Sequence, residues 1–100
     1  IMEENISEIF GLLHQYNMKV SLIQNSAISF SICVEDKFGN FNELKNILAK
    51  KFKVSFNENV SLYTIRHFNE EASAMVEVNK EVLLKQVSRE TMQIVTKDAS

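Results

Sequence analysis

Residues Met18–Val34 read MKVSLIQNSAISFSICV, and they decide the fold of this 100-residue chain. Apolar and polar residues alternate over 18–22 and again over 28–34, which is the period of a β-strand with one buried face. The polar corner Gln24–Ser26 separates the two runs, so the stretch predicts a β-hairpin. Its apolar face is expected to hold Met18, Val20, Leu22, Ile28, Phe30, Ile32 and Val34.

An amphipathic helix is expected before this hairpin. Apolar residues recur at spacings of three and four from Ile6 to Tyr16, which places them on one helical face. Asn5 followed three residues later by Glu8 has the spacing of a capping box, in which each side chain bonds an exposed amide at the helix start. Asn17 tolerates a left-handed backbone and is the expected end of this helix.

A second helix is expected after the hairpin, because Asn40–Glu43 repeats the capping signature. The apolar residues of 41–48 then share one helical face. Val54–Phe56 predicts a short strand that ends at the polar residues 57–59.

The second half of the chain predicts one more strand, one helix and one hairpin. Val60–Phe68 has the composition of a strand, and Asn69–Val76 that of a short helix capped by Asn69. Val82–Val87 and Thr91–Thr96 form a second hairpin around a polar turn.

The order of these elements predicts an α+β protein with a ferredoxin-like βαββαβ unit that lacks its leading strand. Weak internal symmetry divides the chain into a first module over 1–58 and a partial second module over 59–100. We expect the place of the missing strand to be filled by another chain or by Val60–Phe68, because an open edge favours strand exchange.

Composition excludes several classes of protein. The net charge of −2 predicts neither a nucleic-acid nor a membrane-surface binder, and no apolar run has the length of a membrane span. The single Cys33 excludes an internal disulfide and suits a reducing compartment, so a cytoplasmic location is expected. No signal peptide is seen, and the start at Ile1 suggests a fragment.

The residue pattern predicts no catalytic site, no metal site and no cofactor. His14 and His67 lie far apart and without clustered acids or cysteines, so they are not expected to bind a metal. Ser26 and Ser29 lack a neighbouring histidine base, and the chain has no glycine-rich phosphate loop. A basic cluster is expected to be a solvated helix face; it comprises Lys45, Lys50, Lys51 and Lys53.

Three motifs in order resemble the C-terminal regulatory region of aspartate kinase. They are Ile9-Phe10-Gly11-Leu12-Leu13, then Val20-Ser21-Leu22-Ile23, then Asn25-Ser26-Ala27-Ile28-Ser29. The family pattern there is Val-Phe-x-Ile-Leu, Val-Asp-Leu-Ile and Thr-Ser-Glu followed by a strand. Residues 61–67 and 83–95 are similar to parts of the second module of that region.

This resemblance implies a pair of ACT domains that sense an end-product amino acid, lysine or threonine, for an upstream kinase domain. It also implies a homodimer in which two first modules pack side by side. The implied effector site lies at the helix start and the hairpin corner and comprises Glu3, Glu4, Asn5, Ser21, Gln24, Asn25, Ser26 and Ile28. The implied dimer contact comprises Ile23, Gln24, Asn25, Ser26 and Ala27.

The chain departs from the family at two positions of this site. Ser21 and Ala27 stand where the family has carboxylates that hold the effector's ammonium groups. Two lost charge-assisted hydrogen bonds, each about 1.5–3 kcal/mol, weaken binding roughly a hundredfold or more. Glu3 or Glu4 can supply a carboxylate instead. The alternative function is a purely structural dimerisation module that binds no effector. The alternative role of Gln24–Ser26 is simply to form the turn, because Asn and Ser favour turns.

Overall fold

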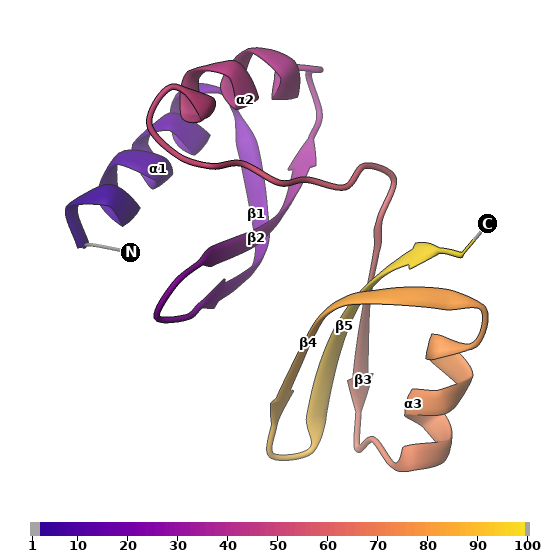
Figure 1. Cartoon of the computed structure of the whole chain (residues 1–100). Helices are drawn as coiled ribbons and strands as arrows, with labels where there is room; N and C mark the ends of the chain where they lie inside the picture. Colours follow the sequence, from indigo (N-terminus) through magenta and orange to yellow (C-terminus); the bar gives the residue numbers. More distant parts are fainter. Residues whose placement is uncertain (1–2, 100) are drawn as a thin grey trace. The chain divides into compact units, whose positions relative to one another are not determined.

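The computed structural model of the chain describes residues 3–99 and is shown in Figure 1. The protein is α+β and divides into two compact units, Ile1–Ser55 and Phe56–Ser100, close to the division expected between residues 58 and 59. The helices are α1 (Glu3–Gln15), α2 (Phe41–Ala49) and α3 (Glu70–Glu77). The strands are β1 (Met18–Asn25), β2 (Phe30–Asp36), β3 (Ser61–Arg66), β4 (Lys80–Ser88) and β5 (Thr91–Asp98).

The first unit is built on the predicted hairpin. β1 and β2 pair antiparallel, and α1 and α2 contribute to a core on one side of this two-stranded sheet (Figure 1). The buried centre of that core is Ile9 and Leu13 from α1, Met18 from β1 and Leu44 from α2. Phe10 meets Phe30 of β2 edge to face, with ring centroids 5.8 Å apart. Most residues of the predicted helical faces therefore lie at the core, whereas Ile6 and Ile47 are not part of it.

A β-bulge changes the predicted apolar face of β1. Val20 lies opposite Val34, but Leu22 lies opposite Cys33, so Ser21 is an extra residue with no partner of its own. Val34 belongs to the face that packs against the core, and Cys33 to the other face. Leu22 therefore faces away from Met18 and Val20, and the prediction that these three residues share a face is wrong.

The hairpin corner also lies later than predicted. Gln24 and Asn25 are the last residues of β1, and the turn is made by Ser26–Ser29. Ile28 is part of this turn and 92% exposed, whereas the sequence placed it in the buried face of the second strand.

Two of the predicted helix caps are wrong. α1 begins at Glu3, so Asn5 lies inside the helix and is not its cap. Asn40 does not cap α2 with its side chain, because that amide donates to the Tyr16 carbonyl at 3.0 Å. Asp36 takes the place of the cap, with its carboxylate accepting from the backbone N–H of Asn40 and Phe41 at 2.9 and 3.0 Å.

Two other local predictions are confirmed. Asn69 caps α3 by accepting a hydrogen bond from the Ala72 N–H at 2.8 Å. Asn17 lies two residues after the end of α1 and has a left-handed backbone conformation, with φ of 58°.

The second unit contains a three-stranded sheet in the order β3-β5-β4. β5 is antiparallel to both neighbours, so β3 and β4 run in the same direction with β5 between them. α3 connects these two parallel strands and contacts both (Figure 1). A strand–helix–strand unit of this kind, split by a third strand, is compatible with a ferredoxin-like fold. Its buried residues include Met92, Ile94 and Val95 of the central strand.

Two predictions about strands do not hold. The expected strand at Val54–Phe56 is absent, since residues 53–57 are neither helix nor strand. β3 does not fill the gap beside the first hairpin, because it pairs with β5 instead. Within residues 3–99, no helix has both the length and the apolar character needed to cross a bilayer.

The two hairpins are structural copies of one another. A shift of 62 residues takes Met18–Asp36 to Lys80–Asp98 and converts every strand pair of the first hairpin into a pair of the second. The bulge follows the same rule, with Leu83 unpaired as Ser21 is. Asn17 and Asn79, which precede the two hairpins, have φ of 58° and 57°. Several residues of the first segment are identical to the residue 62 positions later in the chain. They are Asn17, Val20, Leu22, Gln24, Ser26, Ile32 and Asp36.

Candidate functional site

The structure brings the two parts of the predicted effector site to the same end of the first unit. α1 is joined to β1 by a short turn and runs back along it, so the start of α1 and the end of β1 lie at one end (Figure 1). Glu3, Glu4 and Asn5 occupy the first turn of α1, where N–H groups lack helical partners. Gln24 and Asn25 close β1 at that end.

The turn Ser26–Ser29 has its polar groups bonded to one another. The Ser26 N–H donates to the Ser29 carbonyl at 2.8 Å, and the Ser29 N–H donates to Ser26 Oγ at 3.1 Å. The two hydroxyl oxygens lie 2.8 Å apart. Neither hydroxyl contacts a histidine, so neither is placed for base-assisted nucleophilic attack. These hydrogen bonds explain why a serine at position 26 stabilises the turn.

The remaining predicted residues of the site are exposed. Ser21 is the bulged residue of β1, and a bulge turns a side chain away from the regular alternation of its strand. Ala27 and Ile28 form the tip of the turn, and Ile23 is 42% exposed. The Ile23 and Ile28 side chains supply apolar surface beside the polar residues 24–26.

Carboxylates at this end of the unit come from α1. Glu3 and Glu4 are exposed in its first turn, where the helix dipole favours negative charge. Backbone N–H groups of the same turn favour a carboxylate of a ligand. The helix start therefore offers what both charged groups of a free amino acid need: a carboxylate that accepts from its ammonium group, and N–H groups that donate to its carboxylate.

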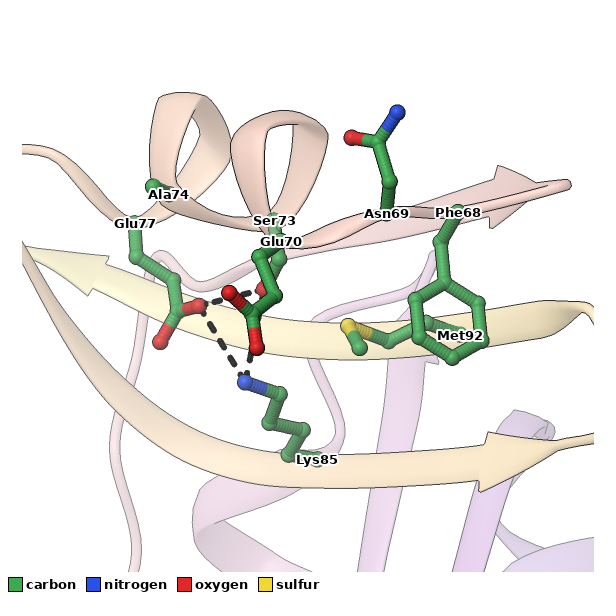
Figure 2. Close-up of a pocket in the computed structure, with 8 residues that line it drawn as sticks. All are labelled: Phe68, Asn69, Glu70, Ser73, Ala74, Glu77, Lys85 and Met92. Atoms are coloured by element: carbon green, nitrogen blue, oxygen red, sulfur yellow. Dashed lines mark hydrogen bonds and ion pairs between the residues drawn. The ribbon is translucent and has the colours of Figure 1, made fainter.

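A hollow in the second unit was not predicted from the sequence. It has a volume of about 200 Å³ and lies between α3, β4 and β5 (Figure 2). Its apolar wall includes Phe68 and Met92, and the carboxylates of Glu70 and Glu77 point toward the Lys85 ammonium in Figure 2.

The polar groups of this hollow are paired internally. Ser73 Oγ is buried and donates to Glu77 Oε2 at 2.6 Å, while Lys85 Nζ contacts the same oxygen at 3.2 Å. These hydrogen bonds, from Ser73 first and then Lys85, lower the pKa of Glu77. A ligand in the hollow would have to replace these bonds, so the network serves first to hold α3 on its sheet. Its sequence signal is Ser73 and Glu77 four residues apart on one helical face.

The other reactive side chains are dispersed over the described residues. Within 3–99, no three metal-binding side chains of the His, Cys, Asp or Glu type gather in one place. His67 Nδ1 lies 2.8 Å from the Glu90 carboxylate, and both groups are exposed. Burial raises the pKa of the Cys33 thiol, which disfavours its reactive thiolate form.

Comparisons with protein-family models, curated proteins and solved structures give no match to this chain.

Proposed function

We propose that the chain is the amino-acid-sensing regulatory and dimerisation region of a cytoplasmic aspartate kinase. In this proposal the two units are ACT modules of the ferredoxin-like type. The observation that carries it is the recurrence of one bulged hairpin after a helix in both units, in the same register. A tandem of related modules is the organisation that the motif resemblance implies.

The topology of the second unit supports the ferredoxin-like assignment. β3, α3, β4 and β5 follow the order β-α-β-β, and the last strand lies between the first two. The first unit contains α-β-β-α, which is the middle of the same six-element pattern. Each unit thus supplies four consecutive elements of a βαββαβ domain.

In the proposed site, a free amino acid such as lysine or threonine binds between the start of α1 and the end of the first hairpin. Its carboxylate accepts hydrogen bonds from backbone N–H groups of the first helical turn. Its ammonium group is held by Glu3 or Glu4, which are the exposed carboxylates of that turn. Ser21, Gln24 and Asn25 provide side chains that select among amino acids.

Regulation in this proposal acts through the dimer. The residues Ile23–Ala27 of two copies lie against one another, so an effector bound beside them favours one dimer arrangement over another. The upstream kinase domain, which carries the ATP chemistry, responds to that shift. The coupling equals the difference in effector affinity between the two arrangements.

Isothermal titration calorimetry and thermal shift with lysine, threonine and methionine test the sensing function. We expect one of them to raise Tm and to bind less tightly when Glu3→Gln and Glu4→Gln are combined. Glu58→Gln with Glu81→Gln is the matched control, since both residues are exposed and outside the site. If the chain and the full-length enzyme respond to none of these amino acids, the sensing function is wrong.

A structural dimerisation module is the second candidate. The observation that favours it is the pair Ser21 and Ala27 in place of carboxylates, together with the 92% exposure of Ile28. Under this function, Ser21→Trp and Asn25→Trp change the oligomeric state measured by light scattering, and no amino acid alters it. An amino-acid-dependent change in the dimer would instead support sensing.

A further inference from the structure

The hollow between α3, β4 and β5 is built entirely by the second unit, because all its lining residues lie between positions 68 and 92. α3 turns the small residues Ser73 and Ala74 toward it, whereas α1 of the first unit packs Ile9 and Leu13 against its own sheet. The smaller side chains leave a volume of about 200 Å³ open. A cavity of about 150 Å³ holds a molecule as large as benzene, so the hollow has room for a ligand of a few carbon atoms.

An ammonium group already occupies the polar end of this hollow. Lys85 Nζ lies 3.2 Å from Glu77 Oε2 and 3.4 Å from Ser73 Oγ. Ser73 is buried and donates to the same Glu77 oxygen at 2.6 Å, which fixes the position of that carboxylate. The Glu70 carboxylate points toward the Lys85 nitrogen as well (Figure 2). These groups form an acceptor site for an ammonium group, and Lys85 shows the chemistry that the site accepts.

The acceptor site holds more negative charge than Lys85 neutralises. Two carboxylates, those of Glu70 and Glu77, face one ammonium group. Among residues 3–99, the Glu70 carboxylate has no hydrogen-bond or ion-pair partner of its own. The Lys85 side chain is 39% exposed and has a flexible four-carbon stem, so its ammonium group can move into solvent while β4 stays in place. A second cation is therefore favoured at this site.

The other end of the hollow is apolar. Met92 is 4% exposed and Phe68 is partly buried, and both lie beyond Glu70 as seen from Glu77 (Figure 2). A ligand with its ammonium group between the two carboxylates therefore extends its carbon chain toward a sulfur atom and an aromatic ring. An anionic ligand would meet the same two carboxylates, and like charges repel.

We propose that the hollow between α3, β4 and β5 binds a small primary alkylammonium ion. The ammonium group of the ligand takes the place of Lys85 Nζ between Glu70 and Glu77, and its carbon chain contacts Phe68 and Met92. The exchange replaces one ammonium group by another, so no buried acceptor loses its partner. The site lies in the second unit and does not depend on amino-acid sensing at the start of α1.

Amide NMR of the full chain with n-butylammonium chloride, at constant pH and ionic strength, tests this site. We expect saturable shifts at the amides of Glu70, Ser73 and Lys85. Sodium pentanoate and 1-butanol carry the same butyl chain with a negative charge and with none, and each should bind at least tenfold more weakly. Absence of saturable shifts with n-butylammonium overturns the proposal. Equal binding of 1-butanol also overturns it, because the hollow would then recognise apolar surface alone.

Glu70→Gln removes the carboxylate that Lys85 leaves without a partner. We expect at least a tenfold loss of n-butylammonium affinity, equivalent to about 1.4 kcal/mol. Glu71→Gln is the matched control, because Glu71 is the next residue of α3, is exposed and does not line the hollow. Its affinity should stay within twofold of the wild type. Equal losses in the two variants mean that the general charge of the helix attracts the cation, which contradicts a defined site.

Lys85→Met removes the competing ammonium group and is expected to raise n-butylammonium affinity at least tenfold. Lys97→Met is its control, since Lys97 lies on β5 outside the hollow and should leave affinity unchanged. Ala74→Leu fills the hollow without removing any charge and should abolish binding, whereas Met75→Leu, at a 73% exposed position, should not. Unchanged affinity in Lys85→Met contradicts the exchange of ammonium groups, and unchanged affinity in Ala74→Leu places the cation outside the hollow.

Discussion

The hairpins Met18–Asp36 and Lys80–Asp98 have one architecture in two environments. They agree in register, in the place of the bulge and in the left-handed asparagine before them. They differ in their neighbours, because β5 has a strand on both edges and β2 on one. Isoleucine at the same position is fully buried in the second hairpin and partly buried in the first.

The difference shows which properties belong to the hairpin and which to its surroundings. Pairing and the bulge recur together, so they are properties of the local sequence of each hairpin. Burial does not recur, so it depends on the elements that surround each hairpin. Energetic comparisons of equivalent residues can therefore separate the two contributions.

The largest expected difference is between Ile94→Ala and Ile32→Ala. Removing a fully buried isoleucine side chain costs about 2–5 kcal/mol of unfolding free energy, because a cavity remains. The partly buried Ile32 is expected to cost roughly 1–2 kcal/mol. Urea denaturation with amide signals from each unit measures both. Equal losses would show that the difference in burial between the two isoleucines carries no difference in unfolding free energy.

Thr96→Val is expected to stabilise the second unit. Thr96 is 1% exposed, and its Oγ1 has no hydrogen-bond partner, which costs about 1–3 kcal/mol. Its equivalent in the first hairpin, Val34, shows that the fold accepts valine at this position. Thermal denaturation should show a higher Tm for Thr96→Val. An unchanged or lower Tm would mean that the hydroxyl is satisfied, for example by a bound water.

Asp36→Ala is expected to lower Tm by a few degrees, and Asp98→Ala to change it little. Both residues are equivalent, but only Asp36 accepts hydrogen bonds from the start of α2. These bonds, the one from Asn40 first, lower the pKa of Asp36 in the folded state.

The effect of Asp36 depends on pH with a definite sign. A folded-state pKa below the unfolded value of about 3.9 gives stability that is present above that pH. This stability is lost as pH falls through the folded-state pKa. The Tm of Asp36→Ala should thus approach that of the wild type in acid. A Tm difference that stays constant from neutral to acidic pH would contradict the role of the ionised carboxylate.

The smallest expected effects are those of Asn17→Gly and Asn79→Gly. Both asparagines have positive φ, which glycine adopts without a steric penalty. Each change is expected to alter unfolding free energy by less than about 0.5 kcal/mol and by similar amounts. Chemical denaturation of the two variants measures this. A large loss at one site alone would show that the two asparagines have different structural roles.

Apart from the strand expected at Val54–Phe56, the sequence predicted the order of helices and strands, because each element has a local signal. Periodicity located α1, α2 and the two hairpins, and Asn69 and Asn17 gave correct ends. The Asn40 cap failed because the competing acceptor, Asp36, precedes it in the sequence and reaches the same amides. A local sequence pattern does not reveal which of two side chains will accept the hydrogen bonds at the helix start.

Periodicity and capping signals did not predict the bulge or the pairing of β3. A bulge adds one residue to one strand, and alternation read on a single strand does not show what lies opposite. Val54 and Phe56 alternate like a strand, but residues 53–57 are neither helix nor strand. The repeat at a shift of 62 residues was visible in the sequence as identical residues, and it would have predicted equivalent bulges.

For the candidate site, the sequence proposed residues but gave no information on their hydrogen bonds. It placed the start of α1 and the corner of the hairpin in one site, and the two do lie at the same end of the unit (Figure 1). It did not foresee that Ser26 and Ser29 bond each other, nor the network of Ser73, Glu77 and Lys85. The latter joins residues on two elements, which no single motif contains.

The bulges also determine where this chain can lose a residue. Ser21 and Leu83 have no opposite partner, so removing either one leaves every other pair and every facing side chain in place. Deletion of a paired residue further along the strand instead moves part of the strand to the opposite face. A deletion scan of either hairpin should therefore find one tolerant position in its first strand, and the two tolerant positions should lie 62 residues apart.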